Sequence, residues 1–314
     1  MIGYLGRRVA LAVPTLFGVT ILLFAVIRAV PGGPGAIFCG DICTEDQVKA
    51  IERELGLDKP LVQQYAVWIG QLGVGDFGTS FQTGLPVAQQ IRDKLPVTVE
   101  VGLLSLVIGM TIAVPVGVLA AVKQDSKLDY ILRSLAIGFL AIPNFWLALL
   151  LLSAGSVYGF WTPPLNYAAP WVDPSRNLQL VLPPAILLGV SLSGPQMRLI
   201  RASMLDVLRQ DYVRTAYAKG LPGRVVVLRH ALRNAAIPTI TLVGAQVPVV
   251  IGGTVLLETI FSVPGMGRYL VTAVNSGDVP IIQTVNLLFA AMVILVNIVV
   301  DASYSIVDPR IRYA

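Results

Sequence analysis

Long apolar runs separated by shorter polar segments set the pattern of the chain. A run of about 20 apolar residues is long enough to cross a bilayer as a helix. Six runs meet this length and are predicted to be membrane spans: 9–30, 97–122, 134–158, 178–197, 235–257 and 281–300. We therefore expect an all-α membrane protein in which residues 1–314 form a single transmembrane domain.

The longest polar segment, residues 31–96, follows the first span. Thr44 and Gln47 have capping-box spacing, which predicts a helix over 44–55. A second amphipathic helix is expected over 60–72, followed by a glycine-rich loop over 73–81 and a short amphipathic lead, 87–95, into the second span. Because the apolar residues recur periodically, we expect a folded cap outside the membrane.

A basic segment, residues 198–233, separates the fourth and fifth spans and carries eight Lys or Arg against two Asp. Asp211 is a good N-cap for a short helix over 212–219, Gly220 suits the C′ position, and Pro222 stops continuation. A second helix is expected from about residue 224, with one apolar face: Val225, Leu228, Leu232 and Ala235. A capped helical hairpin of this kind predicts a docking surface. The alternative is a solvated loop kept basic by topology alone.

Composition agrees with a membrane protein, because only 13% of residues are charged and the mean hydropathy is +0.75. Soluble proteins carry about 25% charged residues. With six spans and a cytoplasmic N-terminus, 15 of the 23 Lys and Arg fall on the cytoplasmic side. This excess predicts that both termini are cytoplasmic. The net charge of +5 is therefore attributed to topology, and no nucleic-acid partner is expected.

Several kinds of chemistry are missing from the spans. No ionisable residue is predicted near a bilayer midplane, which disfavours ion-coupled transport and intramembrane proteolysis. The chain has no Gly-Lys dipeptide and hence no phosphate-binding loop of the Walker A type. The single histidine, His230, is assigned a structural role, and no metal site or catalytic residue is expected.

Polar and small residues within the spans give weaker signals. Asn144, Gln246 and Asn286 are candidates to line a pathway, since polar groups at membrane depth face protein or water. The prolines inside the spans are expected to be tolerated kinks: Pro115, Pro143, Pro238 and Pro248. A stripe of small residues in the second span would suit close helix contact: Gly109, Ala113 and Gly117.

Cys39 and Cys43 both lie in the predicted cap. In an oxidising compartment they would form a disulfide, and two free thiols are the alternative. Two thiols alone make a poor metal site.

Five sequence segments together resemble the permease subunits of bacterial ABC importers, in the dipeptide, oligopeptide and nickel group. They are GDFGTSF, DYVRTAYAKGL, RHALRNAAIPTIT, GGTVLLETIFSVPGMGRYL and the closing DPRIRYA. The family's cytoplasmic signature is the EAA loop, with Glu-Ala-Ala and, after three more residues, Gly. Ala216 and Gly220 keep this register, whereas Arg214 and Thr215 replace the Glu and the first Ala.

The resemblance implies that the short helix docks on an ATPase subunit and couples ATP hydrolysis to transport. The residues it implicates are Asp211, Tyr212, Val213, Arg214, Ala216, Tyr217, Lys219 and Gly220. The region after the fifth span resembles the family's outer gate, which makes Glu258 and Asp278 gate candidates, with a structured turn as the alternative.

The same resemblance implies a set of partners: a second permease subunit, two ATP-binding subunits and an extracytoplasmic substrate-binding protein. ATP and Mg²⁺ would bind only to the ATPase partners, so no cofactor is expected in this chain. Short peptides are the first expected substrate, and nickel chelates, glutathione or oligosaccharides remain alternatives. Two other classes stay open, namely a secondary transporter, which buried ionisable groups would favour, and a membrane scaffold without a pathway.

Overall fold

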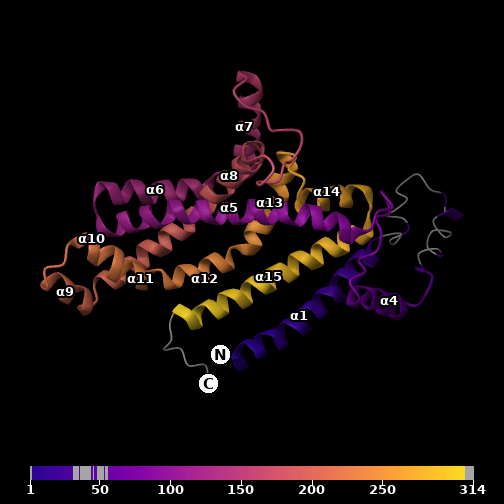
Figure 1. Cartoon of the computed structure of the whole chain (residues 1–314), viewed down its shortest axis with the longest axis horizontal. Helices are drawn as coiled ribbons and strands as arrows, with labels where there is room; N and C mark the ends of the chain where they lie inside the picture. Colours follow the sequence, from indigo (N-terminus) through magenta and orange to yellow (C-terminus); the bar gives the residue numbers. More distant parts are fainter. Residues whose placement is uncertain are drawn as a thin grey trace. The chain divides into compact units, whose positions relative to one another are not determined.

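The computed structural model describes residues 2–30, 35, 44, 46–47, 53 and 56–307. Within them the regular structure is helical, and the only β-type pairing is an isolated bridge between Thr79 and Pro86. This confirms the all-α prediction for the described part of the chain. The α-helices are labelled in Figure 1. In chain order the elements are α1 (Ile2–Ala29), α4 (Leu61–Gly73), α5 (Val87–Val122), α6 (Lys127–Ala141), α7 (Asn144–Tyr158), α8 (Pro174–Leu208), α9 (Asp211–Ala218), α10 (Gly223–Val225), the π-helix η2 (Val226–Ala231), α11 (Leu232–Ala235), α12 (Ile237–Ala245), α13 (Val247–Ile260), α14 (Met266–Ser276) and α15 (Val279–Val307).

The chain divides into two compact units. Unit 1 contains residues 1–98 and 264–295, and unit 2 contains residues 99–263 and 296–314. Each unit is described by itself below.

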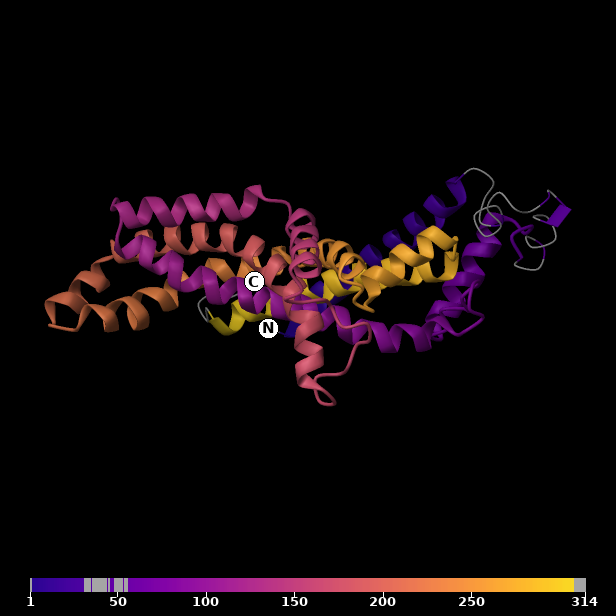
Figure 2. The ribbon, with the colours of Figure 1, turned by 90° about the horizontal axis from the view of Figure 1, so that it is seen from above.

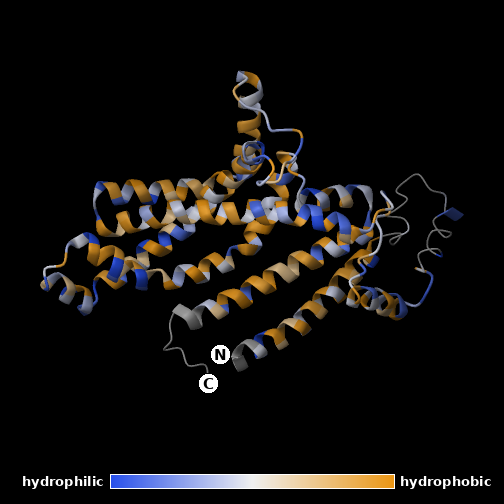
Figure 3. Ribbon diagram, in the orientation of Figure 1, coloured by the Kyte–Doolittle hydropathy of each residue, from blue (hydrophilic) through white to orange (hydrophobic). Residues whose placement is uncertain are grey.

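Four described helices are long and apolar enough to cross a membrane, and the number rises to six if each of two bent helix pairs counts as one span. The apolar colouring of α1 and α15 in Figure 3 makes this plain for the first and last of them. The bent pairs are α6 with α7, at 85°, and α12 with α13, at 45°. Because proline has no N–H to donate and its ring clashes with the preceding turn, it favours breaks of this kind.

The prolines at these breaks stand outside or at the start of the helices they were expected to kink. Pro143 precedes α7 as its N-cap, and Figure 2 shows α7 leaving the direction of α6 steeply. Pro238 and Pro248 occupy first-turn positions of α12 and α13, where a missing N–H costs nothing. Pro115, by contrast, lies within the continuous helix α5.

The core of unit 2 is built around α8, which packs against α6, α7, α11, α12 and α13. Glycines allow its closest contacts. A Cβ built on Gly189 of α8 would lie 2.8 Å from the carbonyl oxygen of Ser105, and one on Gly117 of α5 would lie 2.9 Å from that of Met197. Ala113, which belongs to the same stripe of α5 as Gly117, is fully buried. The predicted small-residue stripe therefore does serve close helix contact, between α5 and α8.

In unit 1, α4 packs on α1 through aromatic side chains. The Tyr65 ring lies edge-on to that of Phe24, with centroids 5.2 Å apart, and its hydroxyl is 2.8 Å from the hydroxyl of Thr20. This confirms the second amphipathic helix, which was predicted over residues 60–72. For the first one, Gln47 Oε1 accepts a hydrogen bond from the Thr44 N–H at 2.8 Å, as a capping box requires. Most of that predicted helix lies outside the described residues.

The candidate coupling hairpin

The hairpin begins later than the sequence suggested, because α8 continues as one helix from Pro174 to Leu208. The predicted span ended at residue 197, so the first 11 residues of the basic segment are helical continuation. In Figure 1, α9 and α10 stand at the end of α8 that lies away from α7. The helix α9 is thus connected to the core of unit 2 through the uninterrupted helix α8.

The start of α9 differs from the prediction. Asp211 is not the N-cap: Gln210 holds that position, without a side-chain hydrogen bond, and Asp211 is the first helical residue. A carboxylate there still interacts favourably with the helix dipole. The Asp211 side chain is almost fully exposed and lies 3.6 Å from Nη1 of Arg214. Because both groups are in solvent, this ion pair adds little stability.

The end of α9 confirms the predicted glycine stop. Gly220 has a φ of +75°, a conformation that side chains other than glycine rarely adopt. Its N–H donates to the Tyr217 carbonyl at 2.9 Å, and the Leu221 N–H reaches the Ala216 carbonyl at 3.4 Å. These two bonds are the pair that defines a Schellman motif. Pro222 follows and precedes α10.

The two faces of α9 have different roles. Val213 and Ala216 are buried within the chain, against Val226 and the partly buried Val207 and Leu208. They attach α9 to the end of α8 and to the second arm of the hairpin, so they are not part of the outward surface. The outward surface is formed by the exposed residues, which are Asp211, Tyr212, Arg214, Thr215, Tyr217, Ala218 and Lys219.

Tyr212 and Tyr217 dominate this outward surface, at 44% and 48% exposure. Asn234 Nδ2 donates a hydrogen bond to the Tyr212 hydroxyl at 2.8 Å, which orients that ring. Large aromatic side chains held in place on a surface are typical anchors of protein interfaces. The hairpin therefore presents two of them beside the cations of Arg214 and Lys219.

The second arm is a helix whose apolar face was predicted correctly at Leu232 and Ala235, which pack in the core of unit 2, and incorrectly at its start. Its residues 226–231 form a π-helix, which is wider than an α-helix and shifts the register of the side chains. As a result Val225 and Leu228 are exposed, while Val226 and Ala231 are fully buried. No local sequence pattern predicts this wider turn.

A buried ion pair that sequence patterns missed fixes α8 to α6. Arg201 donates from Nε and Nη2 to the two carboxylate oxygens of Asp129, at 2.8 and 2.6 Å. Asp129 is fully buried and also accepts the Asp125 N–H at 3.0 Å. The two residues are 72 positions apart, so neither helix pattern alone predicts the pair. The one local signal that could have been used is Ser126, an N-cap with an acid three residues later, a spacing that directs the acid back toward the helix start.

The pathway candidates are placed differently from one another. In unit 2, Gln246 is buried and accepts a hydrogen bond from Gln196 at 2.7 Å, so it joins α8 to the α12–α13 break. Asn144 is half-buried at the start of α7. In unit 1, Asn286 donates to the Ile282 carbonyl of its own helix.

The two gate candidates are both fully buried. Glu258 lies near the end of α13 in unit 2. Asp278 lies just before α15 in unit 1, where its Oδ2 accepts bonds from the Ser80 hydroxyl at 2.5 Å and from the Gln82 N–H at 3.3 Å. Asp278 thus joins the glycine-rich loop to the segment between α14 and α15. The cysteine pair, Cys39 and Cys43, lies outside the described residues.

Comparison with known protein families covers almost the whole chain. Residues 113–313 match the family described as binding-protein-dependent transport system inner membrane component, and residues 1–102 match its N-terminal companion. The di/tripeptide transport system permease protein DppB of Pseudomonas aeruginosa is 39% identical over 338 aligned positions, which cover 100% of this chain and 99% of the relative. The dipeptide transport system permease protein DppB of Escherichia coli is 38% identical, with the same coverage.

A third relative, a putative peptide transport system permease protein of Brucella abortus, is 39% identical over 98% of both chains. Members of this family are membrane components of transport systems and are not themselves catalysts, which confirms the prediction of a non-catalytic subunit. The matches and the apolar helices together identify the chain as a member of the binding-protein-dependent transport system inner membrane component family, a permease subunit of an ABC importer of the peptide group.

Proposed function

We propose that this chain forms half of the translocation pathway of an importer that takes up short peptides. The names of the relatives support peptides as the substrate, since di/tripeptide and dipeptide permeases match over the full length of the chain. The other half of the pathway is a second, similar permease subunit. Two ATP-binding subunits bind ATP and Mg²⁺ and drive transport, and an extracytoplasmic binding protein delivers the peptide.

The proposed topology has six spans, a cap outside the membrane over residues 31–96 and both termini in the cytoplasm. Each bent helix pair then counts as one broken span. The support comes from charge: with this topology the basic segment 198–233, which contains the end of α8 and the hairpin, places eight of the chain's 23 Lys and Arg on the cytoplasmic side. Broken helices are tolerated at membrane depth where protein or a water-filled path surrounds them.

The outward surface of α9 is the proposed contact with an ATPase subunit. One observation supports this most: α9 is attached by Val213 and Ala216 while Tyr212 and Tyr217 stay exposed. The hairpin thus offers a rigid aromatic surface that the described part of the chain leaves about half exposed. Because α9 packs on the end of α8, a displacement of α9 would move α8 and the helices around it as a body.

Site-specific cross-linking in the assembled importer tests this contact. Tyr217→Cys, exposed on α9, should form a disulfide or a short cross-link to a cysteine in the ATPase subunit. Val213→Cys is the matched control, because it lies on the same helix but is buried and should not react. Equal cross-linking of both positions, or of neither in a complex that hydrolyses ATP, would refute the docking surface.

Uptake of a labelled dipeptide into vesicles that contain the assembled importer tests the substrate. Uptake should require the binding protein, and it should require ATP on the side of the vesicle membrane where the ATPase subunits lie. Uptake of a nickel chelate or of glutathione, with no dipeptide uptake, would leave the permease assignment intact and overturn the peptide.

A further inference from the structure

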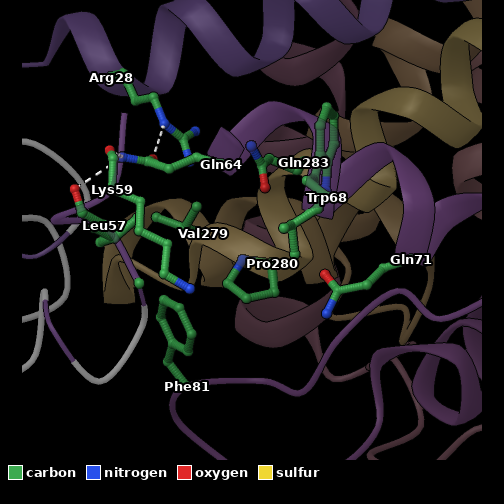
Figure 4. Close-up of a pocket in the computed structure, with 12 residues that line it drawn as sticks. Arg28, Leu57, Lys59, Gln64, Trp68, Gln71, Phe81, Val279, Pro280 and Gln283 are labelled. Atoms are coloured by element: carbon green, nitrogen blue, oxygen red, sulfur yellow. Dashed lines mark hydrogen bonds between the residues drawn. The ribbon is translucent and has the colours of Figure 1, made fainter. Parts of the chain in front are cut away.

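Unit 1 contains a cavity of about 210 Å³ at the place where α1 ends and α15 begins. Figure 4 shows Arg28, Leu57, Lys59 and Gln64 grouped on one side of it, and Trp68, Pro280 and Gln283 on the other. The remaining lining comes from Gly56, Val67, Gln71, Phe81 and Val279. The family membership and the proposed coupling surface assign no role to this cavity.

The guanidinium of Arg28 is held rigidly at the wall of the cavity. Its Nε donates to Gln64 Oε1 at 2.8 Å, and Gln64 is itself fixed because its Nε2 donates to the carbonyls of Leu57 and Lys59, both at 2.8 Å. One face of the guanidinium covers the ring of Phe24, with Cζ 3.4 Å from the ring centroid. The side chain is thus preorganised before any ligand arrives.

One nitrogen of this fixed group has no acceptor. Nη1 of Arg28 is buried and makes no hydrogen bond within the part of the chain that the structure describes. A buried donor on a charged group is costly to leave unsatisfied. Because Arg28 lines the cavity, an acceptor oxygen bound there would lie beside this unsatisfied donor.

The charges around the cavity define the ligand further. Arg28 and Lys59 are both cations, and the described residues that line the cavity include no carboxylate. An anionic group is therefore favoured. A ligand that also brings an ammonium, such as a zwitterionic peptide, would find no counter-ion for it, whereas hydroxyl groups would find the amides of Gln71 and Gln283.

The position of the cavity indicates the source of the anion. Arg28 lies in the last turn of α1, and Val279, Pro280 and Gln283 lie in the first turns of α15. Both helices are candidate membrane spans, over Gly6–Ala29 and Val279–Ser303. The ends of spans lie at the level of the lipid headgroups, where Trp residues such as Trp68 are enriched.

The size of the cavity fits this position. Pockets that enclose a whole small molecule usually measure about 300–1,000 Å³. The smaller cavity here suits a headgroup whose acyl chains remain outside. Apolar side chains of α1 are available to those chains, since Leu22 and Val26 are 62% and 56% exposed.

We propose that the cavity binds the headgroup of an anionic phospholipid of the phosphatidylglycerol type. A phosphate oxygen accepts the hydrogen bond from Nη1 of Arg28, Lys59 adds a second positive charge, and the glycerol hydroxyls bond to Gln71 and Gln283. The site would attach α4 and the ends of α1 and α15 to one leaflet. This inference needs neither the peptide substrate nor the ATPase contact, so it stands or fails independently of them.

Native mass spectrometry of the delipidated importer, titrated with a short-chain phosphatidylglycerol, tests the site. Arg28→Gln should weaken binding about tenfold, because it removes a hydrogen bond from a charged donor. Lys59→Gln should weaken it about fivefold, as expected for one cation near an anionic headgroup. Lys59 is exposed, so this second variant does not threaten folding.

Arg92→Gln is the matched control. Arg92 belongs to unit 1, is exposed and does not line the cavity, so its removal changes the net charge equally without touching the site. Phosphatidylcholine of the same chain length should bind at least tenfold more weakly than phosphatidylglycerol. Equal loss in Arg28→Gln and Arg92→Gln, equal binding of the two lipids, or displacement of the lipid by a zwitterionic dipeptide would each overturn the proposal.

Discussion

Replacing either member of the Asp129–Arg201 pair should destabilise unit 2 more than any surface change in the same region. The pair is bidentate, with nitrogen–oxygen distances of 2.8 and 2.6 Å. The side chain of Asp129 is 0% exposed and that of Arg201 only 16%. Removing one partner from a buried pair leaves an uncompensated charge and costs about 3–5 kcal/mol.

The two single variants should differ in a defined direction. Arg201→Met leaves the fully buried carboxylate of Asp129 with the Asp125 N–H and with Arg133, whose Nε is 3.5 Å away. Asp129→Asn leaves the guanidinium, which still has limited access to water. Because the more deeply buried charge is the harder one to leave unpaired, Arg201→Met should be the costlier change.

The double variant measures how much of each cost belongs to the pair. Asp129→Asn with Arg201→Met should cost less than the sum of the two single changes, with a coupling energy of about 2–3 kcal/mol, since the residues are in direct contact. Unfolding of the purified protein in mixed detergent micelles, followed by far-ultraviolet circular dichroism, gives the three free energies.

Lys127→Met supplies the control, because Lys127 is an exposed cation in the first turn of α6. Its substitution should change the free energy of unfolding by less than about 0.5 kcal/mol. Additive costs for the two single variants, or a Lys127 variant as unstable as Arg201→Met, would refute the assignment of a buried, coupled pair.

Three further predictions concern other parts of the chain. Gly220→Val should lower the amount of peptide taken up per ATP hydrolysed while membrane insertion persists, because a φ of +75° costs a β-branched residue about 1–2 kcal/mol. Gly220→Asn should have a milder effect, and an equal ratio of uptake to hydrolysis in the two variants would contradict this reasoning. Ser80→Ala should expose the glycine-rich loop to proteases, since Asp278 loses its 2.5 Å partner and about 1.5–3 kcal/mol with it, and unchanged cleavage would argue against the contact. Burial, with a further contribution from Glu100, raises the pKa of the Tyr167 hydroxyl to about 12, so its contribution to stability is full below pH 10 and is lost as the pH rises through 12. In an absorbance titration, Tyr167→Phe should therefore remove one tyrosine that ionises near pH 12, and an unchanged titration would exclude this environment.

The helical elements were largely predictable from the sequence because their signals are local. An apolar run identified α1 and the apolar parts of α5 and α15, and an amphipathic period identified α4. The signal for the end of α9 was equally local, since glycine adopts the φ of +75° found at position 220 far more readily than other residues do. Propensity and pattern within one segment determine features of this kind.

The features that the sequence did not reveal depend on segments that meet in space. Arg201 is buried because Asp129 lies opposite it. A hydropathy pattern treats arginine as a surface residue, so it ended the fourth span too early. Similarly, Val213 and Ala216 were expected on the contact surface, because nothing in their own helix indicates that Val226 would cover them. Whether Pro143 kinks a helix or separates two helices at 85° also depends on the packing of α7.

These non-local contacts explain how a short hairpin could work on a large body. The inner face of α9 packs on Val207 and Leu208 at the end of α8, and Arg201 joins the same helix to α6 about two turns earlier. Further along α8, Gly189 lets it approach α5 so closely that an added Cβ would meet Ser105 at 2.8 Å. Close-packed contacts of this kind have little room to yield, so a force applied to α9 moves the helices together instead of being absorbed locally. If α9 is the coupling surface, coupling should therefore be as sensitive to the Asp129–Arg201 pair, which is buried within unit 2, as to the exposed tyrosines.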